Sequence, residues 1–241
     1  MPPYWVYPIG LYGGFLRMLD YGLQMNRNKR FGMAVVLMLG VGAAHAQSGR
    51  WAGKVGYNEF YPQVSSGEIT GVPGSAVDVR RGGGIFGSAV YSFDEHLSAE
   101  LAFGVPPRLD ISGDGAVTAA GKIADTKIYA PIFLVQYRFS PGSAFRPYVG
   151  VGTTYAKFNS VRTTPVLAAL MNQGRDVSAS IDNKWGVTGQ FGMTYDLSPS
   201  WFLDGSIVAM RVKTTARLST GQSVKVSVDP LAVNAAIGYR F

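Results

Sequence analysis

The chain has 241 residues and no cysteine, which excludes disulfides and thiolate metal sites. Its formal net charge is +7 and its pI is about 9.6, with 31 glycines, 13 tyrosines and 13 phenylalanines. Residues 1–46 carry four cations and one anion, Asp20, so the rest of the chain has a net charge of about +4. These charges are scattered, and their excess is too small to indicate nucleic-acid binding.

A secretory signal peptide is predicted at residues 25–46. It has a basic segment at 27–30, an apolar stretch at 31–43 that is shorter than the about 20 residues of a membrane helix, and a small-x-small cleavage pattern ending at Ala46. The mature chain is then residues 47–241, the size of one domain. Residues 1–24 precede this peptide, which has its own Met25. We interpret them as a start codon assigned too early rather than as an extended functional leader.

Eight segments of the mature chain alternate apolar residues with small or polar ones, and a period of two is that of a β-strand. The segments are Trp51–Phe60, Arg81–Phe93, Leu97–Val105, Ile123–Phe139, Phe145–Phe158, Lys184–Tyr195, Trp201–Leu218 and Asp229–Phe241. A strand that spans a membrane in a barrel needs about ten residues of such alternation. The sequence therefore predicts an all-β fold, an eight-stranded antiparallel transmembrane β-barrel.

The connections between these segments alternate in length. Short turns fall at 94–96, 140–143 and 197–200, and long loops at 61–79, 104–122 and 159–183, whereas the last hairpin near 219–223 is shorter. In outer-membrane barrels the short turns face the periplasm and the long loops face outside. Thr164–Asn172 is predicted to be a short helix with Pro165 in its first turn. Pro131 predicts a bulge or a locally unpaired backbone, because proline lacks the ladder donor.

Four blocks of this sequence, in order and at matching spacing, resemble the OmpW family of outer-membrane proteins. They are DEHLSAELAFGVP (94–106), FRPYVGVGTTY (145–155), DNKWGVTGQFGMTYDL (182–197) and the ending DP…AAIGYRF (229–241). The resemblance covers essentially residues 50–241. It implies an eight-stranded barrel in the outer membrane of a Gram-negative bacterium. It also implies a narrow apolar channel for small hydrophobic molecules, including alkane-like compounds, with an exit sideways through a gap in the wall.

The inward positions near the long loops are apolar, whereas the lumen of a water-filled porin is polar. The predicted channel-lining residues are Phe86, Val90, Ala102, Ile128, Ile132, Leu134, Val208, Met210 and Val212. An eight-stranded barrel is also narrow enough for side chains to fill it, so an open and a filled lumen both remain alternatives. In the family, bulky residues at the positions of Ala102 and Val208 form a constriction. Their small size here predicts a wider pore, or a constriction at Phe86 or Met210.

The inward positions near the short turns are charged. The predicted network comprises Lys54, Glu100, Arg138, Arg146, Asp204 and Arg240. Because an unpaired buried charge costs at least several kcal/mol, we expect the four cations to bridge the two carboxylates, with waters. A plug that holds the strands together is the preferred interpretation, and a proton or ion path is the alternative.

The outward positions predict contacts with the membrane. Aromatic residues at the strand ends form girdles at the membrane interfaces. Arg211 and Lys213 point outward near the outer rim, where we expect solvent or lipid contact without a specific site. The expected partners are outer-membrane lipid and lipopolysaccharide, small hydrophobic solutes, and the barrel assembly machinery through the strand ending in Phe241. We expect a monomer.

Catalysis is not predicted. His96 is the one histidine of the mature chain and lies in a short turn, and no GxSxG, HExxH or P-loop motif occurs. Asp110, Asp114 and Asp125 lack the spacing of a calcium loop, so no metal or cofactor is expected. The predicted function is a channel for passive uptake of small hydrophobic molecules. The alternative is a non-transporting surface barrel that acts as a receptor, adhesion or stress protein through its long loops.

Overall fold

The computed structural model describes residues 50–106 and 108–241. The predicted signal peptide, its cleavage site and residues 1–24 lie outside the described residues and stay predictions.

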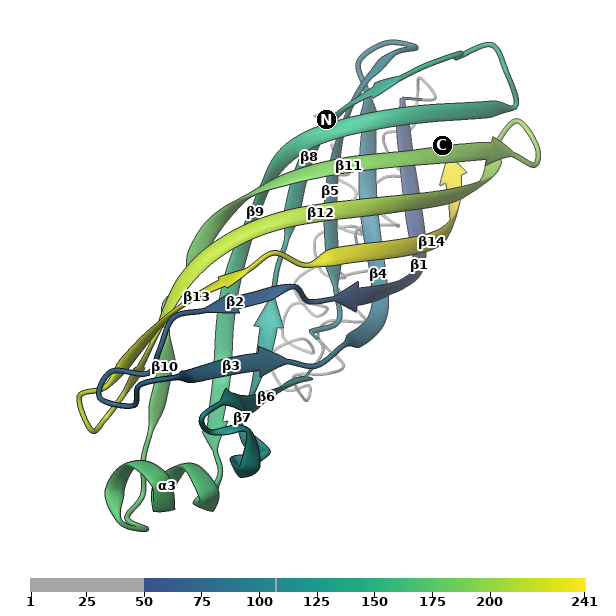
Figure 1. The fold of residues 1–241 in the computed structure, drawn as a ribbon. Helices are drawn as coiled ribbons and strands as arrows, with labels where there is room; N and C mark the ends of the chain where they lie inside the picture. Colours follow the sequence, from purple (N-terminus) through teal and green to yellow (C-terminus); the bar gives the residue numbers. More distant parts are fainter. Residues whose placement is uncertain (1–49, 107) are drawn as a thin grey trace, which may run out of the picture. The chain divides into compact units, whose positions relative to one another are not determined.

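Within these described residues, eight strands close into a barrel (Figure 1). In order around the wall they are β1 (Trp51–Tyr61), β4 (Gly82–Ser92), β5 (Leu97–Gly104), β8 (Ile132–Arg138), β9 (Phe145–Thr163), β11 (Lys184–Asp196), β12 (Trp201–Leu218) and β14 (Leu231–Arg240). Each pairs antiparallel with the next, and β14 pairs with β1 to complete the ring. The predicted fold class is confirmed. Closure gives each of these strands a partner on both sides, so none of the eight is an edge strand.

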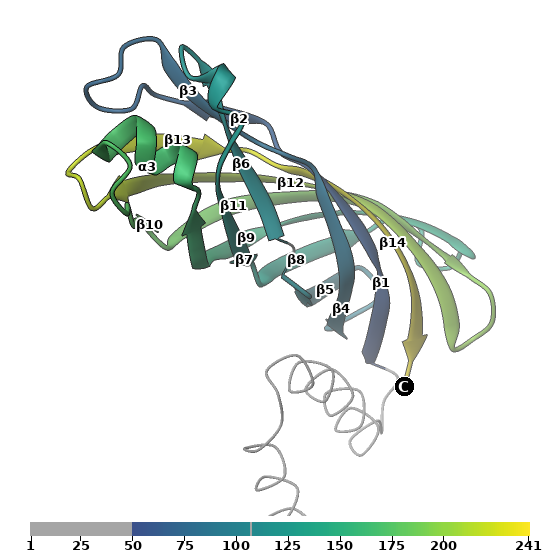
Figure 2. The same ribbon diagram turned by 90° about the horizontal axis from the view of Figure 1, so that it is seen from below.

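Further short strands extend the sheet at the end of the barrel opposite the short turns, where the sequence predicted long loops (Figure 2). They are β2 (Val64–Ser66), β3 (Ser75–Val79), β6 (Arg108–Gly115), β7 (Lys122–Tyr129), β10 (Ala179–Ile181) and β13 (Ser223–Val228). The short helix η1 (Thr118–Ala120) joins β6 to β7. β6 pairs with β3 and β7, while β12 pairs with β10 and β13. The expectation that residues 61–79 and 104–122 are only loops is therefore wrong. We call this end the long-loop end.

Helix α3 (Pro165–Asn172) lies at the long-loop end, close to its predicted bounds. Thr164 caps its N-terminus, with the side-chain oxygen accepting the backbone N–H of Leu167, and Pro165 occupies its first turn. Leu167 and Ala168 are buried against Ile123 and Val177. The helix therefore packs onto the barrel extension. Among the described residues, no helix is long and apolar enough to cross a bilayer.

Pro131 divides the predicted strand Ile123–Phe139 into β7 and β8. The register against β9 is unchanged across it, with Tyr129 opposite Lys157 and Ile132 opposite Thr154. The carbonyl of Pro131 still accepts the N–H of Tyr155, so the site has one missing donor and no inserted residue. The irregularity in the β7–β9 ladder lies instead between Asp125 and Lys127.

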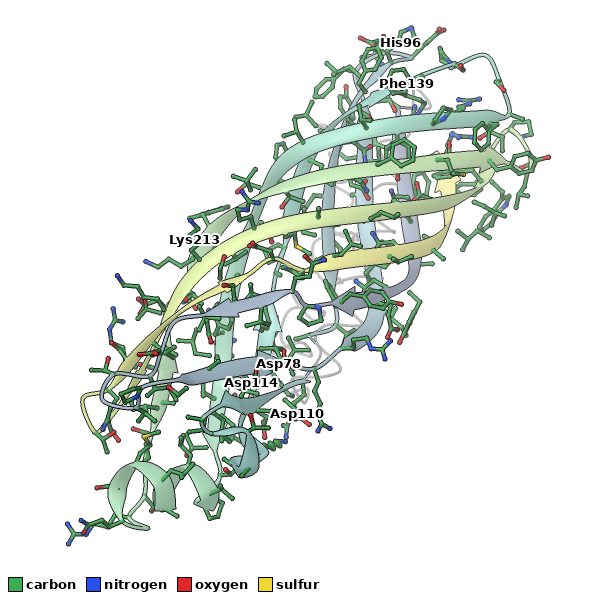
Figure 3. All side chains as sticks on the ribbon, in the orientation of Figure 1. Asp78, His96, Asp110, Asp114, Phe139 and Lys213 are labelled. Atoms are coloured by element: carbon green, nitrogen blue, oxygen red, sulfur yellow. The ribbon has the colours of Figure 1, made fainter. Side chains whose placement is uncertain are left out.

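The opposite end, which we call the short-turn end, carries tight turns and aromatic side chains. His96 and Phe139 mark it in Figure 3. The Asp94 carboxylate accepts the backbone N–H groups of Leu97 and His96, both at 2.7 Å, and these hydrogen bonds lower the pKa of Asp94. Ring contacts on the outer wall join Trp51 to Tyr91 and Trp201 to Tyr239. Such aromatic rows are typical of a membrane interface.

Inward glycines permit close approach of neighbouring strands. Substitution of one of them, Gly152, tests how much this close approach contributes to stability. A Cβ built at Gly152 would overlap the carbonyl oxygen of Phe133 and lie 2.8 Å from the Cα of Leu134, whereas a Cβ at Gly189 would meet nothing within 4 Å. We expect Gly152→Ala to lower the free energy of unfolding by about 1–3 kcal/mol through overpacking, and Gly189→Ala to leave it nearly unchanged. Urea unfolding in lipid vesicles measures both. Equal stability of the two variants would contradict the expectation.

Candidate functional site

The barrel interior holds an apolar cavity of about 120 Å³, which we call the upper lumen. Eight of the nine predicted channel-lining residues line it: Phe86, Ala102, Ile128, Ile132, Leu134, Val208, Met210 and Val212. Val208 and Met210 are buried with Ala232 against Phe60 and Ile132. Because these side chains come from alternate positions of their strands, the lining follows directly from the period of two.

A second apolar cavity of about 100 Å³ lies towards the long-loop end. Leu109, Ile128, Phe158 and Val228 line both cavities, so these four residues lie at the boundary between them, which we call the neck. Leu167 of helix α3 lines the second cavity, as do residues of β3, β6, β7 and β13. An apolar cavity of about 150 Å³ binds benzene in another protein. The two cavities together therefore have the volume and the chemistry for a small elongated apolar molecule.

The neck differs from the expected constriction. Phe86 and Met210 lie in the wall of the upper lumen together with the small residues Ala102 and Val208. The residues shared by the two cavities come from β6, β7, β9 and β13, and β6 and β13 lie in segments that the sequence placed in loops or hairpin ends. Sequence alternation alone did not reveal which side chains meet there.

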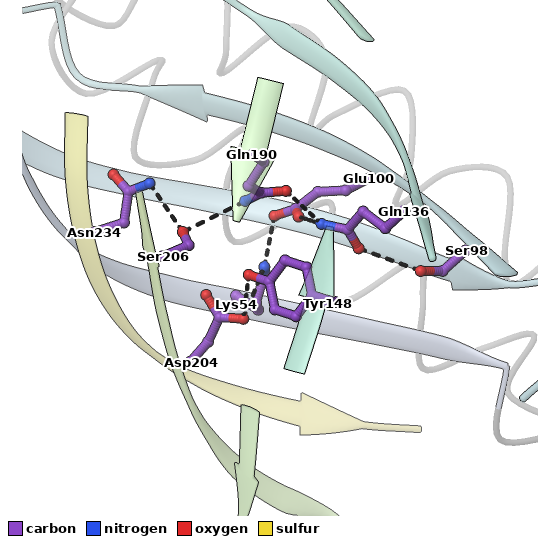
Figure 4. Close-up of polar contacts among 9 residues, drawn as sticks. All are labelled: Lys54, Ser98, Glu100, Gln136, Tyr148, Gln190, Asp204, Ser206 and Asn234. Atoms are coloured by element: carbon purple, nitrogen blue, oxygen red, sulfur yellow. Dashed lines mark hydrogen bonds and ion pairs between the residues drawn. The ribbon is translucent and has the colours of Figure 1, made fainter. Parts of the chain in front are cut away.

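Buried polar side chains close the upper lumen towards the short-turn end, and we call this layer the polar floor. Lys54 Nζ lies 2.7 Å from Glu100 Oε1 and 3.4 Å from Asp204 Oδ2, and all three side chains are at most 4% exposed. Tyr148 donates its hydroxyl hydrogen to Asp204 Oδ2 at 2.9 Å. Figure 4 shows these residues converging from separate strands.

Amides and hydroxyls complete the polar floor. Gln136 Nε2 donates to Glu100 Oε2 and, at 2.7 Å, to Gln190 Oε1. Gln190 and Asn234 both donate to Ser206 Oγ, and Ser98 donates to Gln136. The layer thus takes members from seven of the eight barrel strands of the described chain: β1, β5, β8, β9, β11, β12 and β14. Lys54, Glu100 and Asp204 were predicted to lie together, and they do.

The three arginines of the predicted network do not join the polar floor, so that part of the prediction is wrong. Arg146 and Arg240 both form ion pairs with Asp196, at 2.5 and 2.6 Å. Arg138 forms no ion pair with any described carboxylate. These arginines lie nearer the strand ends than Glu100 and Asp204, which separates them by height in the barrel. Asp196 was missed, although it continues the inward parity of Gln190 and Thr194.

Val90 also lies outside the upper lumen. It pairs with Glu100 across the β4–β5 ladder and lines a small cavity of about 30 Å³ below the polar floor. Arg138, Arg240, Tyr148 and Asp204 line the same cavity. Val90 faces inward as its parity predicts, but the polar floor separates it from the other channel-lining residues.

One cluster of charges at the long-loop end is ion-paired. Lys122 Nζ lies 2.7 Å from Asp110 and 3.3 Å from Asp125, and the hydrogen bond to Asp110 raises the pKa of Lys122. No group of three or more histidines and carboxylates in the described part of the chain is arranged to hold a metal. His96 stacks on Tyr137, and its Nδ1 lies 2.9 Å from the carbonyl oxygen of Arg138.

Comparison with known proteins agrees with this geometry. The family model described as "OmpW family" matches residues 54–241. The chain belongs to the OmpW family. Outer membrane protein W of Vibrio cholerae is 31% identical over 218 residues, which cover 87% of this chain and 97% of that protein. Outer membrane protein AlkL of Ectopseudomonas oleovorans is 23% identical, over 83% of this chain and 85% of that protein.

Solved structures of OmpW-type barrels have the same fold. OprG from Pseudomonas aeruginosa has a TM-score of 0.71 and 25% identity, covering 80% of this chain and 96% of that chain. The Escherichia coli outer membrane protein W has a TM-score of 0.54 and 25% identity, over 80% and 98% of the two chains. This OmpW-family chain is therefore an outer-membrane β-barrel protein of Gram-negative type, and its named relatives are outer-membrane proteins.

The polar floor makes a prediction for stability. Lys54→Met leaves Glu100 and Asp204 buried without their cation, so we expect the free energy of unfolding to fall by about 3–5 kcal/mol. Neutralising all three groups in Lys54→Met/Glu100→Gln/Asp204→Asn should recover much of that loss, because no unpaired charge remains. Urea unfolding in lipid vesicles measures both, with the outward Val55→Met as control. A triple variant no more stable than Lys54→Met would show that charge pairing does not set the stability of this layer.

Proposed function

We propose that this protein is a channel for passive uptake of small hydrophobic molecules through its upper lumen. The observation that carries the proposal is the mainly apolar interior: the second cavity, the neck and the upper lumen follow one another along the barrel, and the polar lining of the upper lumen is mostly that of the polar floor. An apolar solute gains roughly 25 cal/mol per Å² of surface on leaving water for such a lining. The family resemblance supports the same class of solute.

Partition alone supplies the driving force in this proposal. The polar floor fills the cross-section below the upper lumen with paired side chains, so an apolar solute that moved on towards the short-turn end would have to displace hydrogen-bonded and ion-paired groups. Each polar group left unsatisfied would cost about 1–3 kcal/mol. Continued movement along the barrel axis is therefore unfavourable, and a sideways exit requires less free energy.

The wall between β5 and β8 supports a sideways exit. The β5–β8 ladder ends at Ala102 opposite Ile132, and the β6–β7 ladder begins at Arg108 opposite Lys127. Between these ladders Val105 is 54% exposed and lines the upper lumen, together with Phe103 and Pro106. A solute in the upper lumen would meet the membrane at this point through a single layer of apolar side chains.

Narrowing the upper lumen tests the proposal. We expect Val208→Trp and Ala102→Leu to slow uptake of a medium-chain alkane by cells with an intact outer membrane, and Val208→Trp to bring it close to that of cells lacking the protein. Ile207→Trp is the matched control, because Ile207 is the next residue of β12 and faces outward. Uptake is compared at equal levels of folded protein. Equal uptake with and without the protein would reject transport of such solutes.

Replacing helix α3 distinguishes the channel function from the alternative of a surface receptor. The exposed apolar side chains of Val166 and Leu170 favour a surface contact, whereas the buried Leu167 covers the second cavity. Replacing residues 165–172 by a glycine–serine linker of equal length should raise alkane uptake if the helix covers the channel mouth. Unchanged uptake together with lost surface attachment of cells would instead favour the receptor role.

A further inference from the structure

The outer wall carries a group of cations that the channel does not use. Lys157 on β9, Arg211 and Lys213 on β12 and Lys225 on β13 are all exposed. Their positions share the outward parity of the wall: Lys225 pairs with Thr215, which follows Lys213 by two residues on β12. Figure 3 shows Lys213 projecting away from the barrel. We call these four residues the basic patch.

The height of the basic patch on the wall is fixed by β12. The outward positions of this strand are Trp201, Leu203, Gly205, Ile207 and Ala209, and the next outward residue is Arg211. Ten residues along a strand span about 33 Å, and a tilt of about 40° reduces this to about 25 Å along the membrane normal. That is about the height of the apolar band of an outer-membrane barrel. Arg211 therefore lies at the upper limit of the hydrocarbon region, and the basic patch begins there.

An aromatic pair marks the same level. Trp185 and Tyr155 are in ring contact with centroids 4.9 Å apart, and Trp185 is 69% exposed. Trp185 lies two residues from Val187, which pairs with Arg211, so the rings stand beside the basic patch. Aromatic residues at this height are typical of the membrane–water interface. The basic patch thus lies at the level of lipid phosphates.

The basic patch has too few carboxylates to neutralise it. Asp229 lies 3.7 Å from Arg211, whose side chain is 75% exposed. Within residues 50–106 and 108–241, no carboxylate lies within 4.0 Å of the ammonium groups of Lys157, Lys213 or Lys225. The nearby Arg217 differs, because Asp182 pairs with it. Three cations next to apolar wall are therefore available to anions.

We propose that the basic patch binds the phosphates of lipopolysaccharide in the outer leaflet. The patch lies at the long-loop end, which faces outside in this class of barrel. Its cations extend from β9 to β13, so one headgroup with several phosphates can contact more of them than a lipid with one phosphate can. The exposed Val187 and Ile207 below the patch provide apolar surface for acyl chains. This site is independent of the proposed channel.

Lipid binding by the full-length folded barrel tests the site. We expect the triple variant Lys157→Gln/Lys213→Gln/Lys225→Gln to bind purified lipopolysaccharide about a hundredfold more weakly at low salt, since each cation near an anionic surface contributes roughly fivefold. The matched control Arg80→Gln/Arg162→Gln/Arg175→Gln removes three exposed cations outside the basic patch. It should change affinity little.

Two further measurements complete the test. Dephosphorylated lipopolysaccharide should bind the wild type as weakly as the intact form binds the lysine variant, and Lys→Arg at the three positions should restore binding if the glutamine variant folds poorly. If both triple variants lost the same affinity for lipopolysaccharide, net charge alone would explain the loss and the proposed site would be wrong. Equal affinity for phosphatidylglycerol vesicles would overturn the assignment to lipopolysaccharide.

Discussion

Closure of the backbone hydrogen-bond ring is the constraint on which this structure depends. A strand in hydrocarbon has no water to satisfy its edge, so β14 must return to β1 after eight strands. A ring of eight strands is narrow, and large inward side chains fit only where their neighbours are small. A Cβ at Gly192 would lie 2.6 Å from the Tyr148 hydroxyl, and one at Gly238 would overlap the Phe202 ring. These two inward glycines thus make room for large side chains inside a narrow closed ring.

The narrow interior also explains why its charges are arranged in two levels. A charge inside this wall has little water around it, so an ion pair within reach of its own side chain stabilises it. Among the inward cations of the described residues, Arg138 is the exception without such a pair. Lys54 reaches Glu100 and Asp204 from β1, while Arg146 and Arg240 reach only Asp196 nearer the strand ends. Because each pair joins different strands, pairing ties the ring together across its interior as well as around its circumference. The polar floor therefore stabilises the barrel, and because it fills the cross-section it also ends the apolar part of the interior.

The sequence predicted whether a side chain faces inward or outward better than it predicted which side chains contact each other. Parity follows from the strand period alone, so the inward placement of Val208, Lys54 and even Val90 was predictable. Height is different, because it depends on strand tilt and on the stagger between neighbours, which no single strand contains. Asp196 and Arg240 are far apart in sequence and come together only through that stagger. The strands at 75–79 and 108–115 were missed because their alternation is short and their stability comes from pairing with each other.

The alternation of β12 has a consequence for the chemistry of the wall. Val208 faces the interior while its neighbours Ile207 and Ala209 face lipid, so at this level, below Arg211 and Lys213, the wall is apolar on both sides. A hydrophobic solute then has nearly the same free energy in the upper lumen as in the membrane, and water is the one unfavourable phase. In the proposed channel, an interior of this kind would not hold a solute tightly. Net movement would be set by the concentration outside and by removal from the membrane, and the protein would change only the height of the barrier between them.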